Sequence, residues 1–405
     1  MTTKLIAYGA AAEVPVMPGR AWQLRERLRL EYYAQRALLT TRRSGIASPL
    51  MCEDHDCAWF VNYGDVAIAD ALIAHVTANA SVSVIRKNWQ FGRDRGWLDD
   101  VTGPLLVMVC GGGYLFLDKN GQLSPRLASD LAVCRAHGAA WGLAGVGVNQ
   151  LGQQFESLEW DPTTADIDTL GGLIGGAKFV SVRDKPSQLY LKRATGIDVP
   201  LTGDPALFVV DPTHQTSKSV ASGRRLRVGL SIPFHGRAVA ENWNRCSGAV
   251  VAALRVIQQK LDCDYHYFVH HESELFLVRV LKAMGFRLTV HCGSVAKLLS
   301  GYQRVDVHIG GMLHSCILAA NYNVPLVGLA YDAKHLGFVE LMGIGEQIVT
   351  MTPEGLELLP ELVQRTVADL SCVSRKILAA RIKLAPLYWQ TIRAARAQLG
   401  PGVAT

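Results

Sequence analysis

The chain has 405 residues, of which 49% are hydrophobic and 19% charged, and its formal net charge is +6 at pH 7. This length exceeds one ordinary core, so two compact domains are expected, and the composition excludes a fibrous or largely disordered protein. The modest positive charge contains no basic run interleaved with aromatic residues, which argues against nucleic-acid binding.

Short β-rich apolar runs alternate with stretches of helical spacing in the first half of the chain. This alternation is typical of βαβ units that build a parallel sheet. We expect helices at 67–77 and 125–136. The expected strands are 5–8, 58–61, 83–86, 105–109, 140–146, 179–182 and 199–202.

A polar segment at 211–223, rich in Ser, Thr, Gly and Pro, has the composition of a linker. It predicts a first domain at 1–212 and a second at 224–370. We therefore predict an α/β fold with two Rossmann-like domains whose parallel sheets face a cleft, the arrangement called GT-B in glycosyltransferases. The expected strands of the second half are 227–231, 265–269, 288–291, 305–309 and 326–330.

The terminal segment, 371–405, contains several Lys and Arg residues but no Asp or Glu. Its apolar positions predict a basic amphipathic helix that is broken near Pro386. The simpler interpretation is a helix docked on the first domain with its basic face in water. The alternative is peripheral contact with anionic lipid or with a lipid-diphosphate carrier.

Nine scattered cysteines and the lack of a secretory signal before the first expected strand predict reduced thiols and a cytoplasmic location. The segment 52–57 gathers Cys, Asp and His side chains, but it lacks a second ligand pair at finger-like spacing. We interpret it as a polar surface loop and predict no metal. No apolar run approaches the ~20 residues that span a bilayer.

The first motif is Asn62-Tyr63-Gly64-Asp65, where an expected strand ends and a helix begins. Gly64 permits a tight turn and Asp65 can cap the helix, whose first amides favour an anion or a sugar hydroxyl. A simple helix cap explains Asp65 but explains Asn62 less well. Asn62 is therefore a candidate acceptor ligand.

Gly111, Gly112 and Gly113 directly follow the expected strand 105–109. Glycines at the carboxyl end of a strand let a ligand approach the backbone closely, so Gly112 and Gly113 are candidates for acceptor binding. Their spacing matches neither the dinucleotide fingerprint nor the phosphate loop of ATP-binding proteins. We therefore predict no NAD or ATP cofactor.

Arg183 and Asp184 stand where the chain leaves the expected strand 179–182. The donor fork of an arginine suits a carboxylate or phosphate, so Arg183 is a candidate donor ligand. The alternative is a structural pair of neighbours or a helix start. Gly203-Asp204-Pro205, further on, predicts a rigid turn.

Two successive strands of the second half lead to polar side chains. The first enters a loop at Gly311 and a helix with His314 and Ser315, and the next leads to Tyr331 and Lys334. Histidine suits proton transfer near neutral pH, and lysine can neutralise a phosphate. A helix cap and a surface lysine explain either residue alone, but their occurrence at successive strand ends favours one shared site.

These motifs, in content and order, resemble the polysaccharide pyruvyl transferase family over about residues 57–345. The resemblance implies transfer of the three-carbon unit of phosphoenolpyruvate onto a sugar, which forms a pyruvate ketal during exopolysaccharide or cell-envelope synthesis. It implies acid/base and phosphate roles for His314 and Lys334. The implied donor ligands are Arg183, Gly311, Ser315 and Tyr331.

The residue types fit this chemistry, because protonation of the donor methylene makes the central carbon electrophilic and the leaving phosphate needs positive charge. The scheme requires no metal. A sugar hydroxyl needs a base, for which Asp65 is the weaker candidate. The expected acceptor is a sugar, which can be linked to a lipid carrier.

Met312 departs from the family pattern, in which many members carry Arg two residues before the histidine. Either another cation compensates (Arg304, Arg183 or Lys334), or the donor differs, or the transfer activity is lost. Two other functions therefore stay open: a nucleotide-sugar glycosyltransferase and a non-catalytic glycan-binding relative. Thermal stabilisation by phosphoenolpyruvate or by nucleotide sugars distinguishes them.

Overall fold

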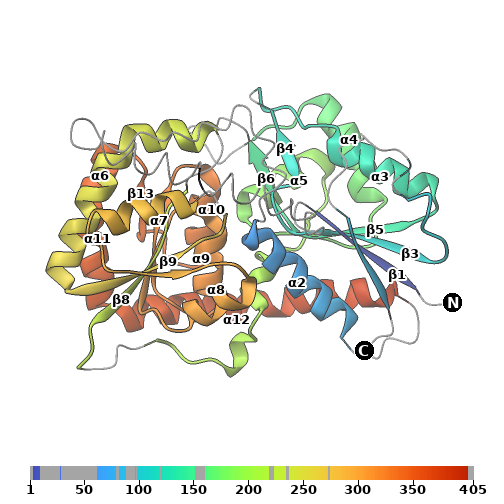
Figure 1. The fold of residues 1–405 in the computed structure, drawn as a ribbon. Helices are drawn as coiled ribbons and strands as arrows, with labels where there is room; N and C mark the ends of the chain where they lie inside the picture. The colour runs from blue at the N-terminus through green and yellow to red at the C-terminus, as the bar shows by residue number, and fades with distance from the viewer. Residues whose placement is uncertain are drawn as a thin grey trace. The chain divides into compact units, whose positions relative to one another are not determined.

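The computed structural model describes residues 3–9, 28, 62–78, 82–87, 96, 98–118, 120–150, 160–218, 223–233, 237–271 and 274–399, without the side chains of 237–244. These residues divide into two compact units. The first unit contains 3–9, 65–213 and 380–399, and the second contains 62–64 and 214–379. Each unit has its own parallel sheet and hydrophobic core (Figure 1).

The first unit contains a five-stranded parallel sheet whose central strands are buried on both faces, as parallel sheets require. A short parallel pair, β4 (Leu115–Leu117) and β6 (Val148–Gln150), follows the ends of two of these strands. In spatial order the main strands are β2 (Ser83–Lys87), β1 (Lys4–Tyr8), β3 (Leu105–Cys110), β5 (Ala140–Val146) and β7 (Val180–Val182).

Local signals set the helix ends in the first unit. A capping box of Thr163 and Asp166 begins α4, and Asp184 caps α5, which ends at the left-handed Gly196. The helices of this unit are α2 (Tyr63–Thr77, whose first two residues belong to the second unit), α3 (Arg126–Ala136), α4 (Thr164–Gly175), α5 (Lys185–Thr195) and the 3-10 helices Pro205–Phe208 and Pro212–His214.

The second unit contains a six-stranded parallel sheet. In spatial order its strands are β10 (Leu288–His291), β9 (Cys263–Phe268), β8 (Leu226–Ser231), β11 (Val307–Gly310), β12 (Leu326–Ala330) and β13 (Ile348–Thr350).

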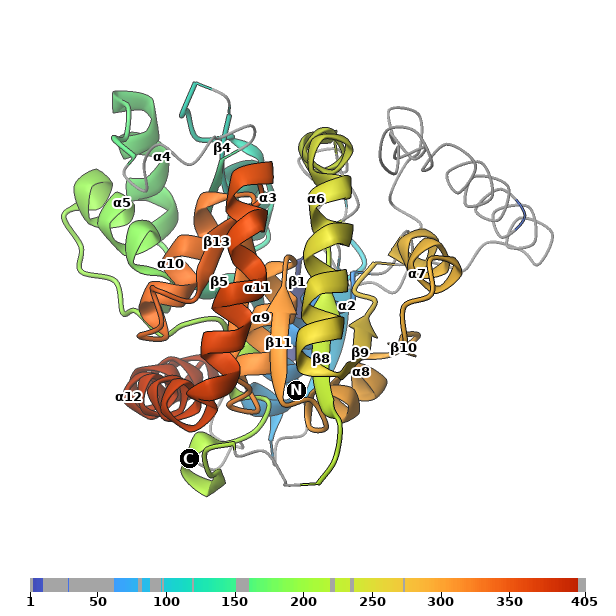
Figure 2. The same ribbon diagram turned by 90° about the vertical axis from the view of Figure 1, so that its left-hand side faces the viewer.

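Two long helices of this unit, α6 (Arg237–Leu261) and α11 (Pro353–Ala368), pack together beside β8 and β11, as Figure 2 shows. Apolar side chains between these helices and the sheet form the core. The other helices are α7 (Glu274–Ala283), α8 (Val295–Tyr302), α9 (Leu313–Ala320), α10 (Ala333–Leu341) and the start of α12 (Leu370–Ala397).

The predicted α/β class with two Rossmann-like parallel sheets is confirmed, whereas the cleft stays a prediction. One expected strand, 199–202, is wrong: only Leu201 pairs with Val182 as an isolated bridge. Pro200 accepts a bond from Val182 but has no N–H to extend the ladder. Strand β13 was not expected from the sequence, and the expected strand 58–61 lies outside the described residues.

The expected break of the terminal helix at Pro386 is also wrong, because α12 continues through this proline. An interior proline costs ~3 kcal/mol, which packing within the first unit offsets. Tyr388 stacks on Phe208 with ring centroids 4.2 Å apart, and Arg381 donates to carbonyl oxygens at 3.0 and 2.7 Å. Within this helix, residues up to 379 belong to the second unit and later ones to the first, and the separate segment 371–405 stays a prediction.

None of the helices in the described ranges is both long enough and apolar enough to cross a membrane.

Candidate functional site

Strands β11 and β12 are hydrogen-bonded neighbours in the second unit, with Gly310 opposite Gly328. Because parallel strands end at the same edge of a sheet, the segments that follow them share that edge. The chain after β11 passes through Gly311 into α9, whose first turn carries His314. After β12 it passes into α10, which carries Lys334. The topology thus places the two predicted catalytic residues at neighbouring strand ends.

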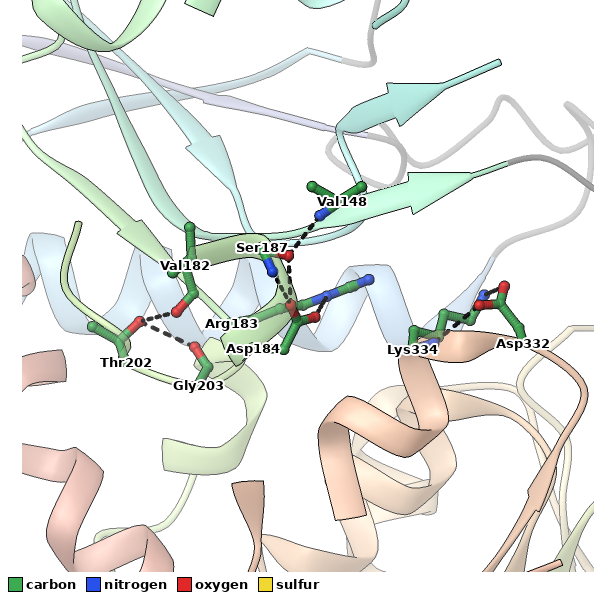
Figure 3. Close-up of polar contacts among 9 residues, drawn as sticks. All are labelled: Val148, Val182, Arg183, Asp184, Ser187, Thr202, Gly203, Asp332 and Lys334. Carbon is green, nitrogen blue, oxygen red and sulfur yellow. Dashed lines mark hydrogen bonds and ion pairs between the residues drawn. The ribbon is translucent and has the colours of Figure 1, made fainter. Parts of the chain in front are cut away.

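Lys334 is held by the residues that precede it, of which Figure 3 draws Asp332. Its Nζ lies 3.1 Å from Oδ2 of Asp332 and 5.2 Å from the ring centroid of Tyr331. Asp332 also caps α10 by accepting from the backbone N–H of Lys334 at 3.0 Å. Burial would raise the pKa of Asp332, but the attraction of Lys334 and the cap hydrogen bond outweigh it and hold this pKa below its usual value. Tyr331 and Lys334 therefore lie together beside an ionised carboxylate.

His335 links the two strand ends, a role that the sequence analysis missed. It is buried, and its Nε2 donates to the carbonyl oxygen of Gly311 at 3.0 Å. Burial, with a smaller effect of Lys334, lowers the pKa of His335 to about 4, so the ring is neutral near pH 7. The signal in the sequence that could have revealed this role is the histidine directly after Lys334. The hydrogen bond from His335 thus connects the backbone at Gly311 to α10.

Ser315 has a structural place that differs from its predicted role as a donor ligand. Its buried hydroxyl donates to the carbonyl oxygen of Met312 at 2.7 Å and lies 3.0 Å from Nε2 of His308. Burial lowers the pKa of His308 to about 3, so a neutral ring donates to the hydroxyl. These contacts explain Ser315 without a ligand, because its hydroxyl holds the first turn of α9, and its role as a donor ligand stays a prediction.

The turn that precedes α2 lies against His314. Tyr63 donates its N–H to the carbonyl oxygen of His270 at 3.0 Å, within the second unit. A Cβ added to Gly64 would lie 2.3 Å from Cγ and Nδ1 of His314. Asn62, predicted as an acceptor ligand, accepts the N–H of Gly64 at 3.1 Å through its side chain. A cap of this kind explains Asn62 without a ligand, so its acceptor role stays a prediction.

The glycines after β3 are explained by packing within the first unit. Gly111 and Gly112 have φ of 53° and 75°, which favours glycine. A Cβ on Gly112 would lie 2.9 Å from the ring of Tyr114, and one on Gly113 would lie 2.8 Å from Cβ of Asn149. Protein side chains thus occupy the space that we had expected a ligand to use. Close approach of a ligand to the backbone therefore no longer supports the acceptor roles of Gly112 and Gly113, which stay predictions.

Arg183 follows β7 and is 6% exposed. Its Nε donates to Oδ2 of Asp184 at 3.2 Å, and Asp184 in turn accepts from the N–H and the hydroxyl of Ser187 (Figure 3). The hydroxyl of Ser187 accepts from the N–H of Val148 at 2.8 Å, which ties this network to β6. Within the described ranges the two terminal nitrogens of Arg183 have no hydrogen-bond partner. This open fork suits a carboxylate or phosphate.

Asp204 is a buried carboxyl that the sequence analysis treated only as part of a turn. Its Oδ1 accepts from the N–H of Ala206 at 3.0 Å, and its Oδ2 has no partner among the described residues. Burial raises its pKa to about 6, although the nearby Arg183 acts in the opposite direction. The carboxyl of Asp204 is therefore about half protonated near pH 6, and the positive charge of Arg183 acts on it.

Two further predictions concern Asp65 and metal binding. Asp65 lies partly buried in the first turn of α2, and its role as a base stays a prediction. Among the residues that the structure describes, no cluster of three or more His, Cys, Asp or Glu could hold a metal. The segment 52–57 lies outside that part of the chain.

Several solved structures are similar to this chain. The S. aureus MnaA structure with UDP has 11% identity and a TM-score of 0.47, covering 93% of this chain and 91% of that chain. A putative UDP-N-acetylglucosamine 2-epimerase from Listeria monocytogenes has 12% identity and a TM-score of 0.49, with coverages of 77% and 88%. The UDP-GlcNAc 2-epimerase from Neisseria meningitidis, bound to UDP-GlcNAc, has 10% identity and a TM-score of 0.47, with coverages of 95% and 99%.

No curated protein sequence matches this chain. The sequence model of the family described as polysaccharide pyruvyl transferase matches residues 62–333, well over half of the chain. That range begins with the turn at Asn62 and includes Arg183 and His314, and it ends at the residue before Lys334. The chain therefore belongs to the polysaccharide pyruvyl transferase family.

Proposed function

We propose that this protein transfers the pyruvyl unit of phosphoenolpyruvate onto a sugar of a polysaccharide or glycan precursor and forms a pyruvate ketal. The observation that carries the proposal is the placement of His314 and Lys334 at the ends of two neighbouring parallel strands, in a chain of this family. Such strand ends are the ligand-binding edge of α/β sheets.

The second unit is proposed as the donor side. Lys334 supplies positive charge for the phosphate, which would compete with Asp332 for Nζ. Tyr331 and the backbone at Gly311 line the same edge of the sheet. Arg183 of the first unit is proposed to hold the donor carboxylate or phosphate with its two open nitrogens.

The proposed reaction begins with transfer of a proton from His314 to the methylene carbon of the donor. The central carbon becomes electrophilic, and a sugar hydroxyl oxygen attacks it. The carbon–oxygen bond to phosphate then breaks, and a second hydroxyl oxygen completes the ketal. Of the two hydroxyl protons, one restores His314 and the other leaves with phosphate, so the scheme balances without a metal or redox cofactor. Asp65 is the proposed base, which takes each hydroxyl proton and passes it on to His314 or to the leaving phosphate.

The first unit is proposed as the acceptor side, and the acceptor as a sugar on a lipid carrier at the inner face of the cytoplasmic membrane. The support is the basic character of α12, which exposes Lys383 and Arg393 together with Ile382. Cations beside an exposed apolar side chain suit anionic headgroups. The rest of α12 in this unit packs inward through residues such as Tyr388.

Ligand-induced thermal stabilisation tests the proposal. A ligand at a hundred times its Kd raises the free energy of unfolding by about 2.7 kcal/mol, so phosphoenolpyruvate should raise Tm measurably. UDP, GDP and CMP sugars, tested at the same concentration, should not. Stabilisation by a nucleotide sugar alone would support a glycosyltransferase, and stabilisation by glycan alone would support a non-catalytic relative. Release of inorganic phosphate from phosphoenolpyruvate with candidate acceptors then tests turnover.

A further inference from the structure

Gly64 lies directly against the side chain of His314. A Cβ added to Gly64 would stand 2.3 Å from Cγ and from Nδ1 of His314, and 2.4 Å from its Cβ. Real Cβ atoms essentially never approach other heavy atoms this closely. Both residues belong to the second unit. The imidazole of His314 therefore rests on the bare backbone of Gly64.

The backbone conformation of Gly64 gives no other reason for a glycine. Gly64 is the second residue of α2, and it is absent from the glycines with positive φ among the described residues. Alanine favours a helix over glycine by roughly 0.5–1 kcal/mol. Local conformation would therefore accept alanine, and the contact with His314 excludes it.

Rotation of His314 cannot relieve a clash with residue 64. Rotation about χ1 moves Cγ and Nδ1, but the Cβ of His314 stays where the backbone places it. On one side, Gly64 is held because Tyr63 donates to the carbonyl oxygen of His270 and Gly64 donates to Asn62. On the other side, Ser315 holds the first turn of α9. Any side chain at 64 must therefore displace a backbone segment.

We propose that Gly64 is a positioning residue for His314, which it holds in one orientation at the edge of the donor-side sheet. What His314 does there rests on the proposed function, but the contact itself does not. The turn 62–64 then lies on the donor side, next to the proton donor. Gly64 acts through His314 and is not itself a catalytic residue.

The test compares Gly64→Ala with Gly248→Ala. Gly248 lies in α6, and a Cβ there would meet nothing within 4 Å, so it is a matched glycine-to-alanine control. NMR of protein with labelled histidine rings, without ligand, reports on His314, whose signals are identified by their loss in His314→Gln. We expect Gly64→Ala to move the His314 ring signals while those of His266 in β9 and His291 in β10, which contact each other at 3.0 Å, stay unchanged. Gly248→Ala should move none of them.

Kinetics provide the second measurement. A shift of about 1 Å in a reacting group can lower turnover ~100-fold, so kcat of Gly64→Ala should fall at least about tenfold while its Kd for phosphoenolpyruvate changes little. A folded Gly64→Ala protein with unchanged His314 signals would overturn the inference. If that variant fails to fold, a nuclear Overhauser contact between the α protons of Gly64 and the β protons of His314 in the wild type decides the question, and its absence refutes the contact.

The two proposals fail separately. If phosphoenolpyruvate neither binds nor turns over in the wild type, the proposed function is wrong, yet the ligand-free signals of His314 still test the contact. If phosphoenolpyruvate is the donor and Gly64→Ala turns over like the wild type, the positioning role is wrong and the function stands.

Discussion

Met312 precedes His314 by two residues, at the position where the resemblance to the family had led us to expect arginine. Its side chain is 5% exposed, and it occupies the N-cap of α9 in extended conformation without a side-chain cap. Met312→Arg therefore places a guanidinium in a nearly closed space at the positive end of a helix. It tests whether the donor site depends on positive charge at this place.

Two effects of opposite sign follow from this position. Without ligand, burial of an unpaired charge costs about 3 kcal/mol, and the helix N-terminus adds roughly 0.3–1 kcal/mol against a cation. With phosphoenolpyruvate bound, the guanidinium gains an anionic partner, which should strengthen binding by ~1 kcal/mol, or about fivefold in Kd. The variant should therefore be less stable than the wild type when free and should bind the donor more tightly.

The assay is calorimetric titration with phosphoenolpyruvate, together with Tm of the free and bound proteins. Met312→Leu is the matched control, because a volume-conserving apolar exchange usually costs less than about 1.5 kcal/mol and adds no charge. If neither wild type nor Met312→Arg binds phosphoenolpyruvate and the variant melts far lower, the pyruvyl transfer assignment should be abandoned. Equal stability and equal affinity would show that Met312 does not face the donor.

Three further predictions follow. His314→Ala and Lys334→Ala should each lower turnover roughly a hundredfold with little change in circular dichroism, as loss of a positioned proton donor or charge does; unfolding of both would assign them to the core. Ser187→Ala should weaken binding of phosphoenolpyruvate, because Asp184 loses a hydrogen bond that orients Arg183; unchanged affinity in a stable variant would remove this network from the site. The folded-state pKa of Asp204, about 6, exceeds its ordinary value of 3.8, so the wild type should lose stability relative to Asp204→Asn as pH rises from about 4 to about 6. Urea unfolding across that range measures the difference, and a constant difference would contradict the burial argument.

Periodicity in the sequence was enough for the α/β class and for most strands. Strands β5 and β12 have the expected bounds, because buried parallel strands are continuous apolar runs that end in turn residues. The edge strand β10, which is only partly buried, also has the expected bounds. The positions of Arg183, His314 and Lys334 just after strands followed from the same pattern. That His314 and Lys334 lie at one sheet edge needed the strand order, which pairs β11 with β12.

The burial and the contacts of individual side chains were decided only by the tertiary structure. Ser315 and His308 look like polar residues near a site, yet burial turns them toward each other and toward the backbone of Met312. Pro386 should break a helix on local grounds, but packing in the first unit outweighs its cost. Gly64 resembles a turn glycine, and only the approach of His314, 250 residues later in the chain, shows why no side chain fits there. Local propensity depends on neighbours within a few residues, whereas these contacts depend on how the strands are ordered.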